Sequence, residues 1–207
     1  MIRLNYFCVV EGQQEAMYLK RISSLLRNPP QRTVSFQTKI GNASELKKST
    51  VEYDKVCLFD HDFRKEEFEN NLKICLALNN KRKKSDAAVE HAYSSICFDL
   101  WLVLHKKFVG RSATSAKEYV DDVREVYSLP KNSNIKSREA IEKILKQITL
   151  DDIKTAIFNA ERIRKSKSEE DKLYVTETDY YYPDPYFSID IFLKKVLEKS
   201  GIDIHTE

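Results

Sequence analysis

The chain has 207 residues, of which 42% are hydrophobic and 32% charged, and its formal net charge at pH 7 is +3. No apolar run approaches the roughly eighteen residues of a membrane span, and no basic segment followed by an apolar core opens the chain. We therefore exclude a membrane protein and expect one large domain, or a domain with an appendage, in the cytoplasm. So small a net charge excludes neither a nucleic acid nor a protein partner.

The four cysteines lie far apart in apolar runs, at Cys8, Cys57, Cys75 and Cys97. None belongs to a Cys-x-x-Cys pair or a cysteine–histidine cluster, which are the spacings typical of zinc sites. We therefore expect buried free thiols rather than a zinc centre.

The first predicted elements are a strand over residues 4–10, a helix over 13–27 and a strand over 33–39. Apolar residues recur in the helix with the spacing of one buried face, and the prolines at 29–30 end it. The second strand alternates between apolar and polar residues, and a short helix is expected over 45–48.

The stretch 53–63, YDKVCLFDHDF, contains a short apolar run that ends in two aspartates, Asp60 and Asp62. Such a run is typical of a buried parallel strand, and ligands bind outside the carboxyl ends of such strands. Side chains alternate along a strand with period two, which predicts that both carboxylates point to the same side.

Two carboxylates held that close repel each other by about 4 kcal/mol at an effective dielectric constant near 20. A bound Mg²⁺ or Mn²⁺, which prefers oxygen ligands, is the usual relief of that repulsion. The alternative for Asp60 and Asp62 is an Asx-turn followed by a helix N-cap, without any metal.

A third acid, Glu11, follows the first predicted strand. If both strands belong to one parallel sheet, Glu11 emerges at the same edge as Asp60 and Asp62. A glutamate after the first strand and Asp-x-Asp after a later one resembles the TOPRIM domain. Topoisomerases, primases and overcoming-lysogenization-defect nucleases use that domain to hold metal beside a phosphodiester.

A helix over 64–78 precedes a basic loop that contains Lys81, Arg82, Lys83 and Lys84. This loop is either a solvated connection or a site of phosphate contact. A weakly patterned strand over 87–95 then leads into the most apolar helical segment, 96–108, in which Phe98 and Trp101 are expected in the core.

Beyond Gly110 the pattern is helical, with helices expected over 115–127, 137–148, 151–167 and 188–199. The predicted fold class is therefore α/β, a TOPRIM-like Rossmannoid parallel sheet of about four strands flanked by helices. We divide the chain into an α/β core over residues 1–110 and a helical extension over 111–207 that packs on it.

Two later features have both a structural and a binding interpretation. The run Tyr180-Tyr181-Tyr182 is either a packed strand edge or a stacking platform for bases. The cations Arg162, Arg164, Lys165 and Lys167 suit the dipole of a helix end, or extend a basic strip towards a phosphate backbone.

Five motifs occur in order along the chain: EGQQEAMYLKRI, LFDHDF, SSICFDLWLVLH, AIFNAERIRK and DPYFSIDIFLKKVL. Together they resemble the RloB family of bacterial phage-defence proteins, over residues 6–197. The resemblance implies a TOPRIM-containing nuclease that acts in abortive infection. It also implies a cognate AAA- or ABC-type ATPase partner (RloA-like).

The resemblance assigns Glu11, Asp60 and Asp62 to the family's metal-binding acids and Glu15 to a second acid often seen after the first. Glu15 lies four residues after Glu11, on the same side of a helix, from which it can reach a second metal. Asp184-Pro185 stands where Asn-Pro is typical.

In the tryptophan motif, Ile96 replaces the family's proline, and Asp99 stands where glutamate is usual. The expected metal ligands are therefore Glu11, Glu15, Asp60 and Asp62, with Asp99 or Glu11 orienting a metal-bound water. His105 is either a boundary histidine or a catalytic or phosphate-binding group.

These residues predict a Mg²⁺- or Mn²⁺-dependent nuclease that acts on DNA or RNA, tRNA included, in anti-phage defence. The alternatives are a non-catalytic subunit that binds nucleic acid or protein and regulates a defence ATPase, and a nucleotidyl-transfer enzyme of the primase kind. A homo-oligomer is compatible with each of them.

Overall fold

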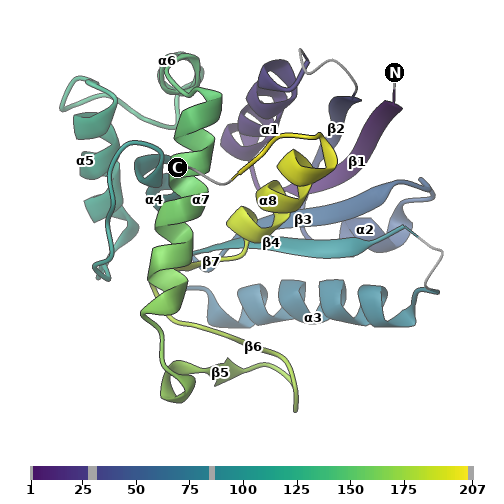
Figure 1. Cartoon of the computed structure of the whole chain (residues 1–207). Helices are drawn as coiled ribbons and strands as arrows, with labels where there is room; N and C mark the ends of the chain where they lie inside the picture. The colour runs from purple at the N-terminus through teal and green to yellow at the C-terminus, as the bar shows by residue number, and fades with distance from the viewer. Residues whose placement is uncertain (1, 28–31, 84–86, 205–207) are drawn as a thin grey trace.

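The computed structural model describes residues 2–27, 32–83 and 87–204 and is built around a five-stranded sheet of order β2-β1-β3-β4-β7 (Figure 1). The strands are β1 (Ile2–Val10), β2 (Arg32–Ile40), β3 (Asp54–Asp60), β4 (Val89–Ser95) and β7 (Tyr186–Phe187). The first four are mutually parallel, and β7 runs antiparallel to β4. The α/β prediction with a helical C-terminal part is confirmed.

Strand register brings the ends of the central strands to one edge of the sheet. Val10 of β1 lies beside Leu58 of β3, and Asp60 of β3 lies beside Ser94 of β4. Glu11 follows β1 directly, so it emerges at the edge where β3 ends with Asp60. We call this side of the sheet the carboxyl edge.

The sheet separates two apolar cores because successive side chains of a strand point to opposite faces. Cys8 and Val10 of β1 pack into the larger core, whereas Phe7 and Val9 pack into the smaller one. The helices are α1 (Gln13–Leu25), α2 (Ser44–Lys48), α3 (Lys65–Lys81), α4 (Phe98–Leu104), α5 (Ala116–Val126), α6 (Arg138–Lys146), α7 (Leu150–Lys165) and α8 (Ile189–Lys199). Helices α2 and α3 cover the smaller core, and the others the larger one.

Helix α4 is shorter than the predicted 96–108, because it begins at Phe98 and continues beyond Leu104 only as a turn. All seven of its residues are buried, Trp101 and Phe98 among them. A helix enclosed on every side has no polar face, so the sequence shows no helical period that would mark its ends.

The later half of the chain completes the sheet as well as flanking it. Strand β7 pairs with β4, and α8, which follows β7 in the chain, also packs against β4. The Ser188 amide between β7 and α8 donates to the Tyr93 carbonyl at 3.0 Å. The division at residue 110 remains a prediction, but the sheet itself extends across it.

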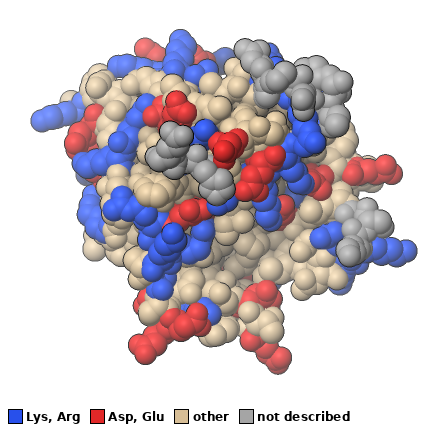
Figure 2. Space-filling view, viewed as in Figure 1, with Lys and Arg blue, Asp and Glu red and all other residues tan. Residues whose placement is uncertain are grey.

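A two-stranded hairpin of β5 (Leu173–Tyr174) and β6 (Tyr180–Tyr181) projects from the bottom of the molecule in Figure 1. Acidic residues gather in this region in Figure 2. In the ranges that the structure describes, no helix has the length and apolarity needed to cross a membrane. All four cysteines are buried and free, as expected.

Among the described residues, two ion pairs join α8 to α7, and one of them is buried; the more exposed pair is Lys194 with Glu161. Arg164 at the end of α7 pairs with Asp190 in the first turn of α8, and the Asp190 carboxylate is almost fully buried. Removing one partner of a buried pair leaves the other charge without compensation, which costs about 3–5 kcal/mol.

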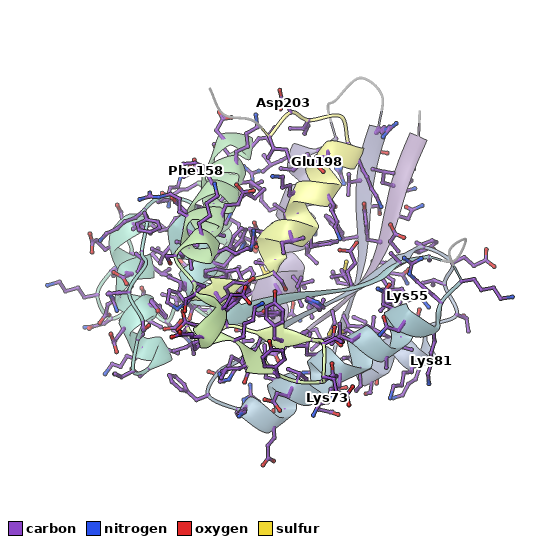
Figure 3. The ribbon with its side chains drawn as sticks, turned by 60° about the horizontal axis from the view of Figure 1, so that its bottom comes forward. Lys55, Lys73, Lys81, Phe158, Glu198 and Asp203 are labelled. Atoms are coloured by element: carbon purple, nitrogen blue, oxygen red, sulfur yellow. The ribbon has the colours of Figure 1, made fainter. Side chains whose placement is uncertain are left out.

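We therefore expect Asp190→Ala to lower the free energy of unfolding by about 3–5 kcal/mol, measured by urea denaturation. Glu198→Ala, at an exposed position of the same helix (Figure 3), is the matched control and should change it by less than about 0.5 kcal/mol. Equal effects of the two substitutions would show that the pair does not fasten α8.

Candidate functional site

Four acidic side chains from four different elements meet at the carboxyl edge. Glu11 follows β1, Glu15 lies in the first turn of α1, Asp60 ends β3 and Asp99 lies in the first turn of α4. The Asp60 Oδ2 atom accepts a hydrogen bond from the Phe98 amide at 2.9 Å, which ties the end of β3 to the start of α4. We call these four acids the acidic site.

The acids are close enough to change each other's pKa. The pKa of Glu11 is raised to about 7, mainly by burial; the Asp60 amide opposes this rise and the nearby Glu15 carboxylate adds to it. Burial also raises the pKa of Asp60 well above its usual range, with repulsion from Glu15 and Glu11 adding to the effect. The pKa of Glu15 is likewise raised by burial, and Asp99 contributes.

Glu15 has a buried carboxylate oxygen that is left without a partner. Its side chain is 7% exposed, and Oε2 makes no hydrogen bond within the described part of the chain. Any side chain at Gly12 would place a Cβ atom 3.2 Å from this oxygen, so the glycine leaves it room. An unpaired buried carboxylate oxygen is costly, because it has lost water and gained nothing in exchange.

A lysine that the sequence analysis did not single out completes the cluster. The Nζ atom of Lys136 lies 3.0 Å from Asp99 Oδ1 and 2.7 Å from Gln14 Oε1. Its positive charge opposes the rise in the pKa values of Glu15 and Asp60 that burial causes. The only local signal was its position directly before Ser137, which caps α6 by accepting from the Ala140 amide. The sequence of this loop does not predict a contact with Asp99.

Asp62 lies differently from the prediction that it points to the same side as Asp60. Strand β3 ends at Asp60, and Asp62 and Phe63 adopt left-handed backbone conformations with φ of 41° and 57°. The period-two rule therefore ends before Asp62, whose half-exposed carboxylate lies 3.1 Å from Arg64 Nη2. Neither aspartate caps α3, because the N-cap of that helix is Arg64. The alternative in which these aspartates form a helix N-cap without metal is therefore wrong.

His105 lies in the core behind α4 rather than in a cleft. Its Nδ1 lies 2.9 Å from the Trp101 carbonyl and its Nε2 lies 3.0 Å from the Tyr18 hydroxyl. A carbonyl only accepts, so Nδ1 carries the proton and Nε2 accepts from the hydroxyl. Burial lowers the pKa of His105 to about 4. This environment favours a structural role over a catalytic one, although His105 is a core residue with both nitrogens bonded rather than the expected boundary histidine.

We accordingly expect His105 to remain neutral across the physiological range. Its imidazole resonances should show no titration between about pH 5 and pH 8 by NMR, because the neutral tautomer fills both hydrogen bonds. A midpoint near the ordinary value of 6.5 would show that the ring is accessible to water and available for proton transfer.

The predicted nucleic-acid-binding run is remote from the acidic site. Lys81 ends α3, and Arg82 and Lys83 follow, whereas Lys84 lies outside the described residues. Helix α3 starts near the carboxyl edge and has 17 residues, so its far end is about 25 Å away at 1.5 Å per residue. Figure 3 shows Lys81 near Lys55, at the start of β3.

The tyrosine run is mainly a packing element. Tyr181 is buried with its ring 4.9 Å from that of Phe68, and Tyr182 packs on Tyr186 at 4.8 Å. Tyr180 is exposed, but Lys172 lies 4.0 Å over its ring. The acidic segment Glu169–Asp171 close by disfavours a phosphate backbone at this hairpin.

The cations at the end of α7 are largely engaged within the fold. Arg164 pairs with Asp190, the guanidinium of Arg162 lies 3.8 Å from the centre of the Phe108 ring, and the Nζ atom of Lys167 donates to the Pro183 carbonyl at 3.0 Å. Lys165 lies close enough to Glu161 for its charge to help lower the pKa of that carboxyl. These contacts favour the structural interpretation over a basic strip.

Asp184 connects the segment before β7 to α5 and does not join the acidic site. Its Oδ2 accepts from the Ala113 amide at 2.7 Å and from the Tyr119 hydroxyl at 3.0 Å. Burial raises the pKa of Asp184 to about 6.

The chemistry of the acidic site fits a hard divalent cation. Carboxylate oxygens are the ligands that Mg²⁺ and Mn²⁺ prefer, and the Glu15 oxygen without a partner is one such donor. Among the described residues, no three acidic, histidine or cysteine side chains are already arranged as a metal cluster. A cation would therefore be held after the carboxylates of Glu11, Glu15 and Asp60 turn towards it.

The raised pKa values give the acidic site a characteristic pH dependence. A carboxyl group with a raised pKa binds a proton more tightly in the fold, so its contribution to stability is lost as pH rises from about 4.5 to about 7. Without divalent ions, the melting temperature of the unmodified chain should therefore fall over that interval relative to Glu11→Gln, which lacks this titrating group. The comparison removes the opposing effect of His91 and His105, whose pKa values burial lowers to about 4. Added Mg²⁺ or Mn²⁺ should raise it more at pH 8 than at pH 5, because only the ionised carboxylates bind metal.

Glu15→Gln should raise the metal-free melting temperature at pH 8, by about 2–4 °C for each kcal/mol of relieved repulsion, and should reduce stabilisation by Mn²⁺. Differential scanning fluorimetry with Mn²⁺ or EDTA measures both effects. Glu52→Gln makes the same chemical change at an exposed position and should do neither. Equal Mn²⁺ stabilisation of all three proteins would place the cation elsewhere.

Comparison with known proteins gives one positive result. The family model described as RloB-like protein matches residues 6–195. No curated protein and no solved structure matches the chain significantly. The match covers most of the chain, including every member of the acidic site, and we conclude that this chain belongs to the RloB-like family.

Proposed function

We propose that this chain is a Mg²⁺- or Mn²⁺-dependent nuclease that cleaves DNA or RNA, tRNA included, in bacterial anti-phage defence. The observation that carries the proposal is the convergence of Glu11, Glu15 and Asp60 at the carboxyl edge, each with a raised pKa. Buried carboxylates that repel each other are the groups that a divalent cation stabilises. The defence role and an ATPase partner rest on the resemblance to RloB-like proteins.

The residues of the site suit phosphodiester hydrolysis. A divalent cation bound there would neutralise phosphoryl oxygens and lower the pKa of a bound water. Asp99 or Glu11, whose carboxylates lie at the carboxyl edge, would orient the attacking water and accept its proton. Lys136 carries a positive charge beside Asp99, where it can pair with a phosphoryl oxygen.

A non-catalytic role is the second candidate, as a subunit that binds nucleic acid or protein and regulates a defence ATPase. It is favoured by the bond from Lys136 to Asp99, because a lysine within the cluster partly compensates the acids without metal. The described residues also contain no ready-made metal cluster. Here the same acids would form a binding surface.

The nuclease proposal predicts that Asp60→Asn lowers metal-dependent cleavage of labelled DNA or tRNA by at least about 100-fold. The amide keeps the size of the side chain and an oxygen for the Phe98 amide, so the fold should persist. Asp121→Asn, an exposed position on α5, is the control and should retain activity.

Cleavage is measured with Mn²⁺, with Mg²⁺ and with EDTA, alone and with the cognate ATPase. If the unmodified chain never cleaves under these conditions, or if Asp60→Asn cleaves equally well, the nuclease proposal fails. Retained phage defence by Asp60→Ala would then favour the regulatory subunit.

A further inference from the structure

A large groove opens on the face of the molecule formed by α1, β2 and α6. Its volume is about 1380 Å³, and residues of all three elements line it. Helix α6 packs beside α1, as Figure 1 shows, and β2 is the edge strand next to β1. From α1 the groove takes residues spaced three or four apart, which form one side of the helix.

The charge of the groove is strongly one-sided. Glu142 is the single acidic side chain among its described lining residues. The basic side chains that line it come from β1, from α1 and the turn after it, and from α6, whereas β2 contributes none. Apart from Lys136 they are Arg3, Lys20, Arg21, Arg27, Arg138 and Lys146. A cleft lined by one sign of charge concentrates ligands of the opposite sign.

Several of these cations are available to a ligand. Lys20, Arg27 and Lys146 are exposed and make no ion pair with another described residue. Arg21 is held in place because its guanidinium donates to the Ile148 carbonyl at 2.8 Å. A carbonyl carries no net charge, so this contact does not neutralise Arg21. Arg138 alone is paired with the groove's acid, Glu142, at 3.0 Å.

One end of the groove meets the acidic site. Lys136 lines the groove and also bonds to Asp99 and Gln14. Gln13, which opens α1, lines the groove two residues before Glu15. A chain of phosphates lying in the groove would therefore lead directly to the buried carboxylates.

We propose that this groove binds the phosphodiester backbone of a nucleic acid and guides it to the acidic site. This inference rests on the proposed nuclease function and names its substrate-binding surface. Helix α1 spans about 20 Å at 1.5 Å per residue, the length of about six phosphates at the 3.4 Å spacing of one duplex strand. The groove replaces the run at Lys81–Lys83, which lies at the other edge of the sheet, as the principal phosphate contact.

Fluorescence anisotropy with labelled oligonucleotides tests the groove separately from cleavage. The full chain is titrated into single-stranded RNA, single-stranded DNA and duplex DNA in EDTA, so that metal-dependent cleavage does not occur. The double variant Lys20→Glu/Lys146→Glu should bind at least about 10-fold more weakly. The slope of log affinity against log salt should become shallower by about 1.4 for a single strand and about 1.8 for a duplex.

A matched double variant, Lys73→Glu/Lys117→Glu, changes the total charge equally at exposed positions on α3 and α5. It should bind as the unmodified chain does, and thermal melts should show all variants folded. The three oligonucleotides compared in this way identify the nucleic acid that the groove prefers.

The inference is overturned if the matched variant loses as much affinity as the groove variant, since bulk charge then explains the effect. It is also overturned if Lys81→Glu/Lys83→Glu loses more affinity than the groove variant, or if the unmodified chain binds none of the three oligonucleotides. Groove-dependent binding by a chain that never cleaves with metal would leave the groove standing and remove the nuclease proposal.

Discussion

Repulsion between buried carboxylates is the constraint around which the carboxyl edge is organised. The register between β1 and β3 brings Glu11 next to the end of the strand that carries Asp60, and the first turn of α1 adds Glu15. Burial weakens the screening that water would supply, which raises the pKa values of these acids and makes a neighbouring positive charge favourable. The Phe98 amide and Lys136 supply part of that compensation. A divalent cation would supply the rest.

The same constraint links segments that are distant in sequence. The site takes residues from the loop after β1, the end of β3, the start of α4 and the loop before α6. Gln14 bridges two of these segments, because its amide donates to Asp99 and accepts from Lys136. Since Lys136 also lines the basic groove, the position of α6 determines both the compensation of the acids and the path by which phosphates would approach them.

The sequence predicted the features that depend on local periodicity. The apolar runs before Glu11 and Asp60 identified β1 and β3, and the parallel order of the strands then placed both acids at one edge. Asp62 was harder to place, because a left-handed turn begins immediately after the strand and no residue pattern announces it. Strand β4 had a weak pattern because its polar Glu90 and His91 find partners in Lys195 and Ser188, about a hundred residues later. The role of Lys136 was not predictable for the same reason, because its partners Gln14 and Asp99 are distant in the sequence.

The pairing of β7 with β4 also determines when the molecule can be completed. Residues of the acidic site all occur in the first two thirds of the chain, but the last strand of the sheet comes from Tyr186–Phe187 and its covering helix follows. During synthesis from the N-terminus, the segments that carry the acids therefore emerge from the ribosome long before the segment that covers the apolar face of β4. Contacts of such high sequence separation form late, and a nascent or truncated chain would expose β4 to chaperones and proteases. Translation itself thus delays the completion of the sheet beside the site until residues 186–199 have been made.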